Sequence, residues 1–279
     1  EDLIRRMMTF TQKRGPDASN FFSNENVTLG HDRLSIIDLK ERSNQPFNYK
    51  HLTLSYNGEI YNYKSLKKVL ENQGYVFKTT SDTEVIIFLF DKYGIESFKK
   101  LSGIFAISIW DDLNKTLYLI RDIVGVKPLY YYEDSKDNFL FSSSIRSILS
   151  YNSNYEINEK ALFYYKNIGR NESNETFFKG IYKLLPGQLI IKKKNQSKKI
   201  FKYLNFRFNQ TNFKDPKEKI SEIIKSQFIS DVPIALSLSG GYDSNIIYDV
   251  MRNNIEKKNY SIYSFFFHDY NKFNQDYNI

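Results

Sequence analysis

The sequence contains no cysteine, only three histidines and no long apolar run. The lack of cysteine excludes disulfides, cysteine-ligated metal sites and a thiol nucleophile within these 279 residues. The histidines, His31, His51 and His268, have no spacing typical of metal ligands, so each is expected to be structural or exposed. No stretch has the length and apolarity of a transmembrane helix, and no signal-peptide pattern is found, so the expected location is the cytoplasm.

Length and composition indicate roughly two globular domains. Hydrophobic residues make up 41% of the chain and aromatic residues 16%, which is enough for a sizeable core. The net charge of +8 is dispersed, apart from one basic run, Lys192–Lys199, between strand-like residues 188–191 and 200–204. That run is expected at a hairpin tip. The dispersed charge argues against a nucleic-acid or membrane partner.

The most informative stretch is Ile234–Ser244, with the sequence IALSLSGGYDS. Residues 234–238 predict a buried strand, followed by a Ser-Gly-Gly loop and a helix. Because glycine adopts positive φ at little cost, the N–H groups of residues 239–241 can turn inward and form an anion cradle at the helix N-terminus. An ordinary strand-to-helix turn is the alternative interpretation.

The residues around this stretch predict a parallel sheet. Asp215 is a typical N-cap and Pro216 a typical first helical residue, for a helix that runs to about Phe228. A second strand is expected at Ser261–Phe267, so the order is helix, strand, helix, strand. Ligands of such sheets bind at the carboxyl ends of the strands, where residues 239–244 fall.

The residues before 205 predict mainly antiparallel strands. Strand-like residues 104–110 and 116–121 flank one turn, and 129–133 and 139–142 flank another. Asn57-Gly58 alone is typical of a hairpin turn.

A capping box, Ser81-Asp82-Thr83-Glu84, predicts a helix through Tyr93, with Glu84 reaching back to the N-cap. Asp82 in that first turn has a purely structural alternative, because a carboxylate there complements the helix dipole.

Several strings resemble known families, in the same order along the chain. SGGYDS resembles the SGGxDS pyrophosphate loop of the ATP-pyrophosphatase superfamily, whose members cleave ATP to AMP and pyrophosphate. Strings in the first half resemble the class II glutamine amidotransferase domain: RGPD at 14–17, HDRLSIIDL at 31–39, NGEIYN at 57–62, SDTEV at 81–85 and RDIVGVKPLYY at 121–131. Together with SDVPIALSLSGGYDS at 230–244, the chain resembles the glutamine-hydrolysing asparagine synthetase family.

This resemblance implies a fold for each half. Residues 1–204 are expected to form an α+β N-terminal-nucleophile hydrolase sandwich, αββα, with antiparallel sheets. Residues 205–214 would be a linker. Residues 215–279 would be the start of an α/β parallel-sheet nucleotide-binding domain.

The resemblance also implies site residues. Arg14 would bind the glutamine carboxylate, for which a guanidinium fork is suited, and Asp82 and Glu59 would bind the ammonium group. The Asn57 side chain and the Gly58 N–H would form the oxyanion hole. ATP and magnesium are the expected cofactors, with Asp243 as the magnesium contact. The expected nucleotide-binding residues are Leu238, Ser239, Gly240, Gly241, Asp243, Ser244 and Phe267.

The nucleophile of the resembled family is an N-terminal cysteine, which this sequence lacks. The favoured interpretation is that the chain is truncated at both ends, because its first residues already carry a helical pattern, and that this fragment is inactive as a glutaminase. The alternative is a parent without the cysteine, as in the β-lactam synthetases, whose amidotransferase domain is inactive.

The implied function is a ligase that uses ATP and glutamine to convert aspartate to asparagine, releasing AMP and pyrophosphate. The expected partners are glutamine and aspartate or another carboxylate, and a homodimer stays open. Three alternatives remain: a paralogue that amidates another carboxylate such as a sugar acid, a tRNA-modifying ATP-pyrophosphatase, and a non-catalytic binding protein. Four positions depart from the family pattern and have no assigned role: Asp32, Ile123, Ser144 and Tyr242.

Overall fold

The computed structural model describes residues 1–152, 154–171, 173–204, 215–256 and 260–265. The chain divides into two compact units, Glu1–Arg207 and Phe208–Ile279. The predicted linker, 205–214, lies outside the described residues, as do Phe267 and His268.

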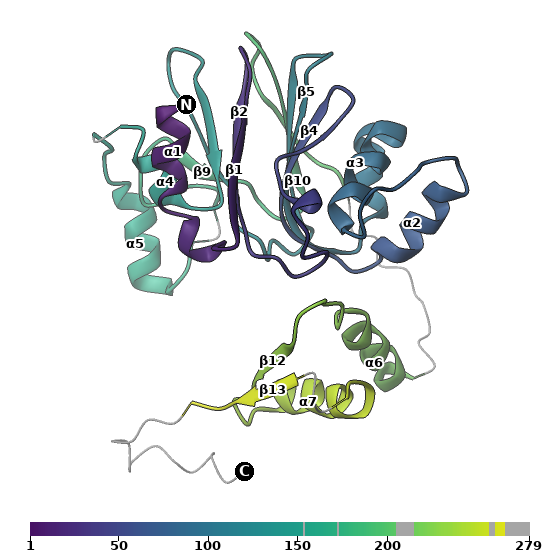
Figure 1. Cartoon of the computed structure of the whole chain (residues 1–279). Coiled ribbons are helices and arrows are strands. Elements are labelled where there is room, and N and C mark those ends of the chain that lie inside the picture. Colours follow the sequence, from purple (N-terminus) through teal and green to yellow (C-terminus); the bar gives the residue numbers. More distant parts are fainter. Residues whose placement is uncertain (153, 172, 205–214, 257–259, 266–279) are drawn as a thin grey trace. The chain divides into compact units, whose positions relative to one another are not determined.

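In the first unit, two layers of antiparallel strands lie face to face between helices (Figure 1). One layer is a six-stranded sheet in the order β11-β10-β6-β5-β4-β3, and the other holds the smaller sheets β1-β2 and β8-β7-β9. The strands are β1 (Ala18–Ser23), β2 (Thr28–Arg33), β3 (Phe47–Tyr49), β4 (Leu52–Ile60), β5 (Gly103–Asp111), β6 (Thr116–Arg121), β7 (Tyr130–Glu133), β8 (Phe139–Ser142), β9 (Ile181–Lys183), β10 (Gln188–Lys193) and β11 (Lys199–Lys202).

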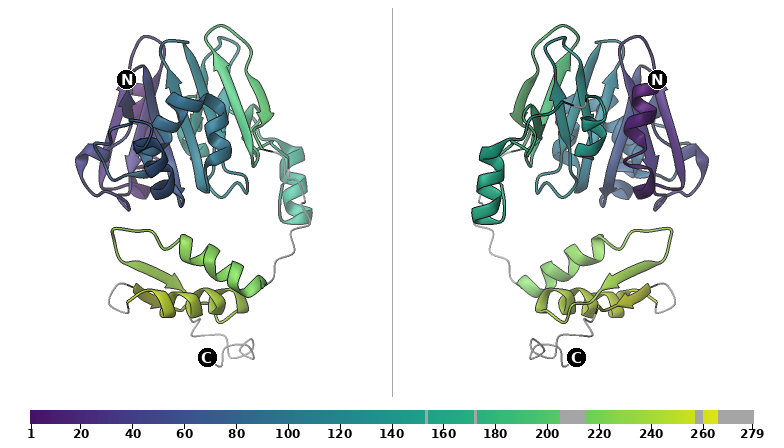
Figure 2. Two further views of the ribbon diagram at one scale, coloured as in Figure 1. Left: turned by 90° about the vertical axis from the view of Figure 1, so that its right-hand side faces the viewer. Right: turned by 90° about the vertical axis from the view of Figure 1, so that its left-hand side faces the viewer.

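Helices cover both outer faces of this sandwich. On the side of the six-stranded sheet lie α2 (Tyr63–Glu71) and α3 (Asp82–Tyr93), as Figure 2 also shows. On the opposite side lie α1 (Asp2–Met8), α4 (Ile145–Leu149) and α5 (Glu159–Ile168). Short 3-10 turns are η1 (Gln12–Arg14), η2 (Glu41–Ser43) and η3 (Gly94–Lys100). The predicted αββα arrangement of antiparallel sheets is confirmed.

The space between the two layers is apolar at one end. Successive side chains of a strand point to opposite faces, so β5 sends Ala106 and Trp110 inward while Ile107 and Ile109 face the helices. The interior cluster joins both layers: Leu29, Ala106, Trp110, Leu117, Leu119, Leu129, Tyr131, Leu184 and Ile190. Because these side chains come from both sheets, their burial holds the layers together.

Local expectations are confirmed at some positions and wrong at others. The Ser81 side chain caps α3 by accepting the N–H of Thr83, as predicted. Glu84 does not return to the N-cap: its carboxylate accepts the N–H groups of Lys78 and Thr79. The hairpin interpretation of Asn57-Gly58 is also wrong, because both residues lie within β4 and pair with β5.

The second unit contains α6 (Pro216–Ser226), β12 (Ile234–Ser237), α7 (Tyr242–Asn254) and β13 (Tyr260–Tyr263). The predicted parallel pairing is confirmed, since Ile234 aligns with Tyr260 and Ser237 with Tyr263. The strand was expected to be buried, yet Ala235 is exposed. Among the described residues, β12 pairs only with β13, so little covers it. No described helix in either unit combines the length and apolarity needed to span a bilayer.

Candidate functional site

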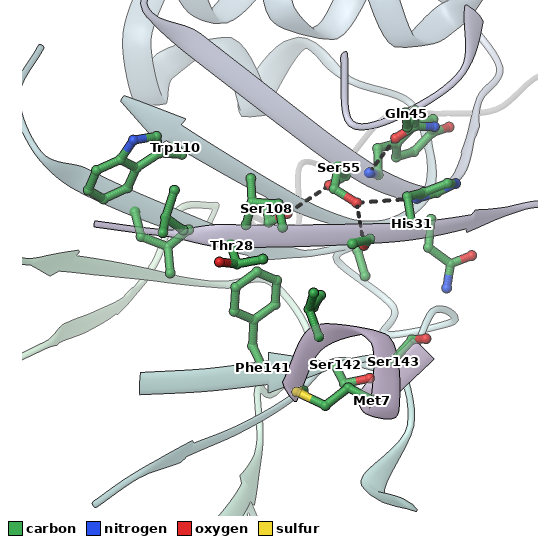
Figure 3. A pocket seen from close by; sticks show the side chains of 18 of the residues that line it. Met7, Thr28, His31, Gln45, Ser55, Ser108, Trp110, Phe141, Ser142 and Ser143 are labelled. Carbon is green, nitrogen blue, oxygen red and sulfur yellow. Dashed lines mark hydrogen bonds between the residues drawn. The ribbon is translucent and has the colours of Figure 1, made fainter. Parts of the chain in front are cut away.

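A cavity of about 1000 Å³ lies within the first unit, lined by residues of β2, β4, β5 and β8 and by the start of α3. The five residues expected to bind glutamine all line it: Arg14, Asn57, Gly58, Glu59 and Asp82. Figure 3 shows part of its lining, with Trp110 and Phe141 toward one side and His31 and Gln45 toward the other. The polar lining thus continues from the apolar interior of the sandwich.

Asn57 and Gly58 reach the cavity from the middle of β4. Asn57 pairs with Ala106 of β5, and Gly58 pairs with Phe105. A Cβ atom on Gly58 would lie 2.0 Å from the carbonyl oxygen of Ile104 and 2.7 Å from the Cα of Phe105. Only glycine allows the two backbones to approach this closely. Close strand pairing therefore fixes the position of the Asn57 side chain beside the Gly58 peptide.

Asp82 stands at the first position of α3 and is only 4% exposed. Its Oδ2 accepts the Tyr56 hydroxyl at 2.7 Å and the Ile60 N–H at 3.0 Å. Burial raises the pKa of this carboxyl, although the hydrogen bonds from Tyr56 and Ile60 oppose the rise. The result is a rigidly held, poorly solvated carboxylate at the cavity wall.

Glu59 adds a second carboxylate to the same cavity. Burial is the main cause that raises its pKa, and the neighbouring Asp82 charge adds to the rise, while Lys127 lowers it. Two carboxylates that disfavour each other's ionisation make a site that favours a bound cation. A ligand ammonium group placed between them would offset both the cost of burying the charged carboxylates and the repulsion between them.

Lys127 belongs to a loop that a buried carboxylate organises. Asp122, with no exposed surface, accepts the N–H groups of five residues: Phe105, Val124, Gly125, Val126 and Lys127. Arg121 fastens the other side of the loop by donating to the carbonyls of Lys127, Gly125 and Leu184. The loop thereby holds Lys127 at the cavity wall.

Two arginines line the cavity, and they differ in burial. Arg14 is exposed at the end of η1, and its Nη1 donates to Ser143 Oγ at 3.1 Å. Arg33, at the end of β2, is only 6% exposed and donates to the carbonyls of Ile37 and Asp38. The exposed guanidinium of Arg14 is therefore the more accessible to a ligand carboxylate.

Arg33 was not among the site residues predicted from the sequence. Its guanidinium also donates to the Lys40 carbonyl and to Asn44 Oδ1, so it organises the chain from residue 37 to residue 44 beside the cavity. Burial lowers its pKa. The sequence did contain a signal for Arg33, which is a charged residue inside the strand-like run VTLGHDRLSII. Alternate residues of a strand face the same side, so Arg33 faces the same side as the buried Leu29.

His31, which was expected to be structural or exposed, is half-buried and lines the cavity. His31 Nδ1 lies 3.2 Å from Ser55 Oγ (Figure 3). The Ser55 hydroxyl also lies 3.4 Å from the Gly30 carbonyl, to which it can donate. The Ser108 hydroxyl donates to the Ser55 carbonyl at 3.0 Å. Burial, followed by the Arg33 charge, lowers the pKa of His31 to about 4. The imidazole is therefore neutral at pH 7.

The four positions that depart from the family pattern, Asp32, Ile123, Ser144 and Tyr242, lie in different local environments. Asp32 accepts hydrogen bonds from the hydroxyls of Thr11 and Ser19, so it joins β1, β2 and the residue before η1. Ser144 precedes α4, and its N–H donates to Ser142 Oγ. Tyr242 is 90% exposed at the start of α7. Nothing in the structure explains Ile123 or Tyr242.

The Ser-Gly-Gly loop of the second unit joins β12 to α7. Gly240 has φ +83°, and Asn245 Nδ2 donates to its carbonyl at 3.0 Å. The Ser244 hydroxyl donates to the Gly241 carbonyl at 2.9 Å and lies 3.2 Å from Ser239 Oγ. No side chain caps the first N–H groups of α7, which therefore remain able to bind an anion.

The remaining nucleotide-site residues follow the same local arrangement. Asp243 is exposed in the first turn of α7, and Leu238 is buried directly before the loop. Among the described residues, no three His, Cys, Asp or Glu side chains gather as a protein-only metal site. One carboxylate beside an anion cradle fits magnesium that is held mainly by phosphates. Phe267 lies outside the described residues.

Curated relatives match most of this chain. Asparagine synthetase [glutamine-hydrolyzing] 1 of Bacillus subtilis is 36% identical over 260 residues, which are 90% of this chain and 41% of that protein. Asparagine synthetase B [glutamine-hydrolyzing] of Escherichia coli is 30% identical over 236 residues, or 84% of this chain and 38% of that protein. The chain thus spans about two fifths of the length of these relatives.

A structural match and a family model complete the comparison. A glutamine phosphoribosylpyrophosphate amidotransferase from B. subtilis aligns with a TM-score of 0.47 at 17% identity, over 85% of this chain and 51% of that one. A model of the glutamine amidotransferase domain matches residues 1–204. That match covers more than half of the sequence and includes every residue of the cavity, so the chain belongs to the glutamine amidotransferase domain family.

Proposed function

We propose that the cavity of the first unit binds glutamine and that the protein uses it as a nitrogen donor. The observation that carries this proposal is the convergence of Asn57, Gly58, Glu59 and Asp82 on one cavity, together with the raised pKa of both carboxyls. Those carboxylates favour a cation, and the ammonium group of an amino acid is one.

The other groups of glutamine have matching partners. The exposed guanidinium of Arg14 can take the α-carboxylate in a charge-assisted hydrogen bond. The Asn57 side chain and the Gly58 N–H can donate to the side-chain carbonyl, and to the oxyanion that forms when a nucleophile attacks it. Loss of one such donor typically costs about a hundredfold to a thousandfold in rate.

We propose further that the whole protein couples this nitrogen to ATP-driven amidation of aspartate, yielding asparagine, AMP and pyrophosphate. Relatives named as glutamine-hydrolysing asparagine synthetases support the acceptor, and the SGGYDS loop supports the use of ATP. When bound, magnesium would neutralise charge on the leaving pyrophosphate. In this chain, Asp243 would contact the metal, and Ser239, Gly240, Gly241 and Ser244 would orient the phosphates.

A second candidate is amidation of a different carboxylate. The observation behind it is that a relative with a different name, Amidase chry2 from Gibberella zeae, is 33% identical over 248 residues, so identity at this level is not confined to proteins named asparagine synthetase. The acceptor identity separates the two candidates. Asparagine formed from aspartate, ATP and ammonium chloride would favour the first, and turnover of another acceptor alone would favour the second.

Calorimetric titration of the 279-residue chain with glutamine tests the cavity. Wild-type protein should bind glutamine, and Arg14→Ala should weaken binding at least tenfold, the loss expected for a charge-assisted hydrogen bond. Lys13→Ala is the matched control, because Lys13 is an exposed neighbour in η1 that does not line the cavity. Absence of glutamine binding in the wild-type chain would overturn the proposal.

A further inference from the structure

We propose that His31 selects glutamine over glutamate by accepting a hydrogen bond from the carboxamide NH₂ group, with Ser55 holding the imidazole in the required tautomer. The inference rests on the proposed glutamine site. It assigns a role to a histidine that neither the cavity's charge pattern nor the oxyanion donors require.

The hydrogen bonds around Ser55 are consistent with the tautomer that the proposal requires. In the proposed arrangement the single proton of the Ser55 hydroxyl points to the Gly30 carbonyl, 3.4 Å away, which can only accept. Ser55 Oγ then accepts from His31 Nδ1–H, 3.2 Å away. In a neutral imidazole, a protonated Nδ1 leaves Nε2 as an acceptor. Within the described residues, Nε2 has no protein partner, so its lone pair is available to a ligand.

The position of His31 places this acceptor near the carboxamide. His31 contacts Ser55, and Asn57 is the next residue of β4 that points to the same face, about 7 Å along the strand. A carboxamide bound through its oxygen at Asn57 and Gly58 must direct its NH₂ group toward another part of the cavity wall. The imidazole of His31 lies beside Ser55 in the cavity lining (Figure 3), and we place the NH₂ group against it.

The chemistry discriminates between the two amino acids. Glutamine offers two N–H donors at its side-chain end, whereas glutamate offers a carboxylate that would face the Nε2 lone pair without a proton between them. A site that hydrogen-bonds a substrate N–H rejects the analogue that lacks it, because the site's own polar group is left unpaired. His31 would therefore disfavour glutamate while the imidazole stays neutral.

Other charged groups share the cavity and must be separated from His31 in any pH experiment. From η1, β2, β4, α3 and the loop before β7 they include Arg14, Asp32, Arg33, Glu59, Asp82 and Lys127. The decisive comparison is therefore made at constant pH 7 between two ligands, glutamine and glutamate. Their α-carboxylate and α-ammonium groups are identical, so the contributions of groups that bind those ends cancel.

The variants are His31→Leu and Ser55→Ala. His31→Leu should weaken glutamine binding about threefold to tenfold, the range of one neutral hydrogen bond, while glutamate binding stays equal or becomes tighter. Ser55→Ala should reduce the selectivity in the same direction, because the Nδ1–H tautomer loses its acceptor. His51→Asn is the control, because His51 does not line the cavity.

An NMR measurement on the wild-type protein tests the tautomer directly, so it does not depend on whether the variants fold. Nitrogen-15 NMR of the wild-type imidazole should show Nδ1 protonated and Nε2 unprotonated at pH 7, with the Nε2 resonance shifting on addition of glutamine but not of glutamate. An Nε2–H tautomer, or equal loss of affinity for both ligands in folded His31→Leu, overturns the inference. A wild-type chain that binds neither ligand would instead overturn the proposed glutamine site.

Discussion

The cavity proposed to bind glutamine and the Ser-Gly-Gly loop differ in the groups that would contact a ligand, which are side chains in the cavity and main-chain N–H groups in the loop. In the cavity, side chains from β2, β4 and α3 converge, and the buried Asp82 is held by Tyr56, which is 26 residues away in sequence. In the loop, recognition would rest on main-chain N–H groups, and the side-chain hydrogen bonds of Ser239, Ser244 and Asn245 are made within residues 239–245.

This difference predicts how each site responds to mutation. Side chains that shape the cavity also stabilise the sandwich, so their loss should affect folding and binding together. Side chains of the loop are mostly exposed and local, so their loss should affect anion binding alone. Trp110 is the single tryptophan and is buried between the layers, so its fluorescence reports unfolding of the first unit.

The largest effect is expected for Asp122→Ala. The change leaves five backbone N–H donors of a buried loop without their acceptor, so the free energy of unfolding should fall by about 3–5 kcal/mol. Urea unfolding followed by Trp110 fluorescence measures it. Asp243→Ala, in the loop of the second unit, should change that value by less than about 0.5 kcal/mol. A stable Asp122→Ala protein would show that water replaces the carboxylate.

A glycine in each region gives the next largest effect. Gly58→Ala places a methyl group against the Ile104 carbonyl, so β4 and β5 must separate; stability should fall by about 2–3 kcal/mol and glutamine affinity more than tenfold. Gly240→Ala introduces the strain of a positive φ, which costs about 1–2 kcal/mol and is confined to the second unit. Its glutamine affinity, measured by calorimetry, should equal that of the wild type.

The same contrast explains what the sequence could predict. The loop was predictable because Ser239, Gly240 and Gly241 act through backbone geometry that adjacent residues determine. Ser81 was likewise assigned as an N-cap, since its partner, Thr83, is two residues away. The antiparallel hairpins followed from strand-like runs on either side of short polar turns.

Features that depend on how another strand or loop folds against a residue were not predictable in this way. Asn57-Gly58 has the composition of a turn, but pairing with Phe105 and Ala106 keeps it extended. Glu84 has N–H partners at Lys78 and Thr79 because the preceding loop folds back over α3. The role of Arg33 became visible only when residues 37–44 were seen to place their carbonyls around its guanidinium.

Glu59→Gln tests whether a cavity residue is placed for binding at the expense of stability. The folded protein raises the pKa of Glu59 above its usual 4.5, so this residue favours folding below that pH, and its contribution is lost as the pH rises through the raised value. The carboxamide introduced by the substitution cannot ionise, so at pH 7 the variant should unfold at equal or higher urea concentration than wild type.

Glutamine affinity should respond in the opposite direction. An ammonium ligand binds the ionised carboxylate, so wild-type affinity should fall as the pH is lowered through the raised pKa of Glu59. Glu59→Gln should weaken binding at pH 7 and reduce this pH dependence, with Asp82 supplying what remains. Calorimetry at a series of pH values from neutral pH downward measures both. An unchanged pH profile would exclude Glu59 from the ammonium site.

The smallest effect is expected in the loop. Asn245→Ala removes the donor that fixes the Gly240 and Gly241 carbonyls, so the neighbouring N–H groups lose part of their orientation. Affinity for magnesium pyrophosphate should fall about twofold to tenfold, the range of one neutral hydrogen bond, without a change in Trp110-monitored unfolding. Asn253→Ala is the matched control, because the Asn253 amide donates within α7, away from the loop. Equal losses in the two variants would mean that helix stability, rather than loop orientation, governs anion binding, and the contrast between the two sites would then fail.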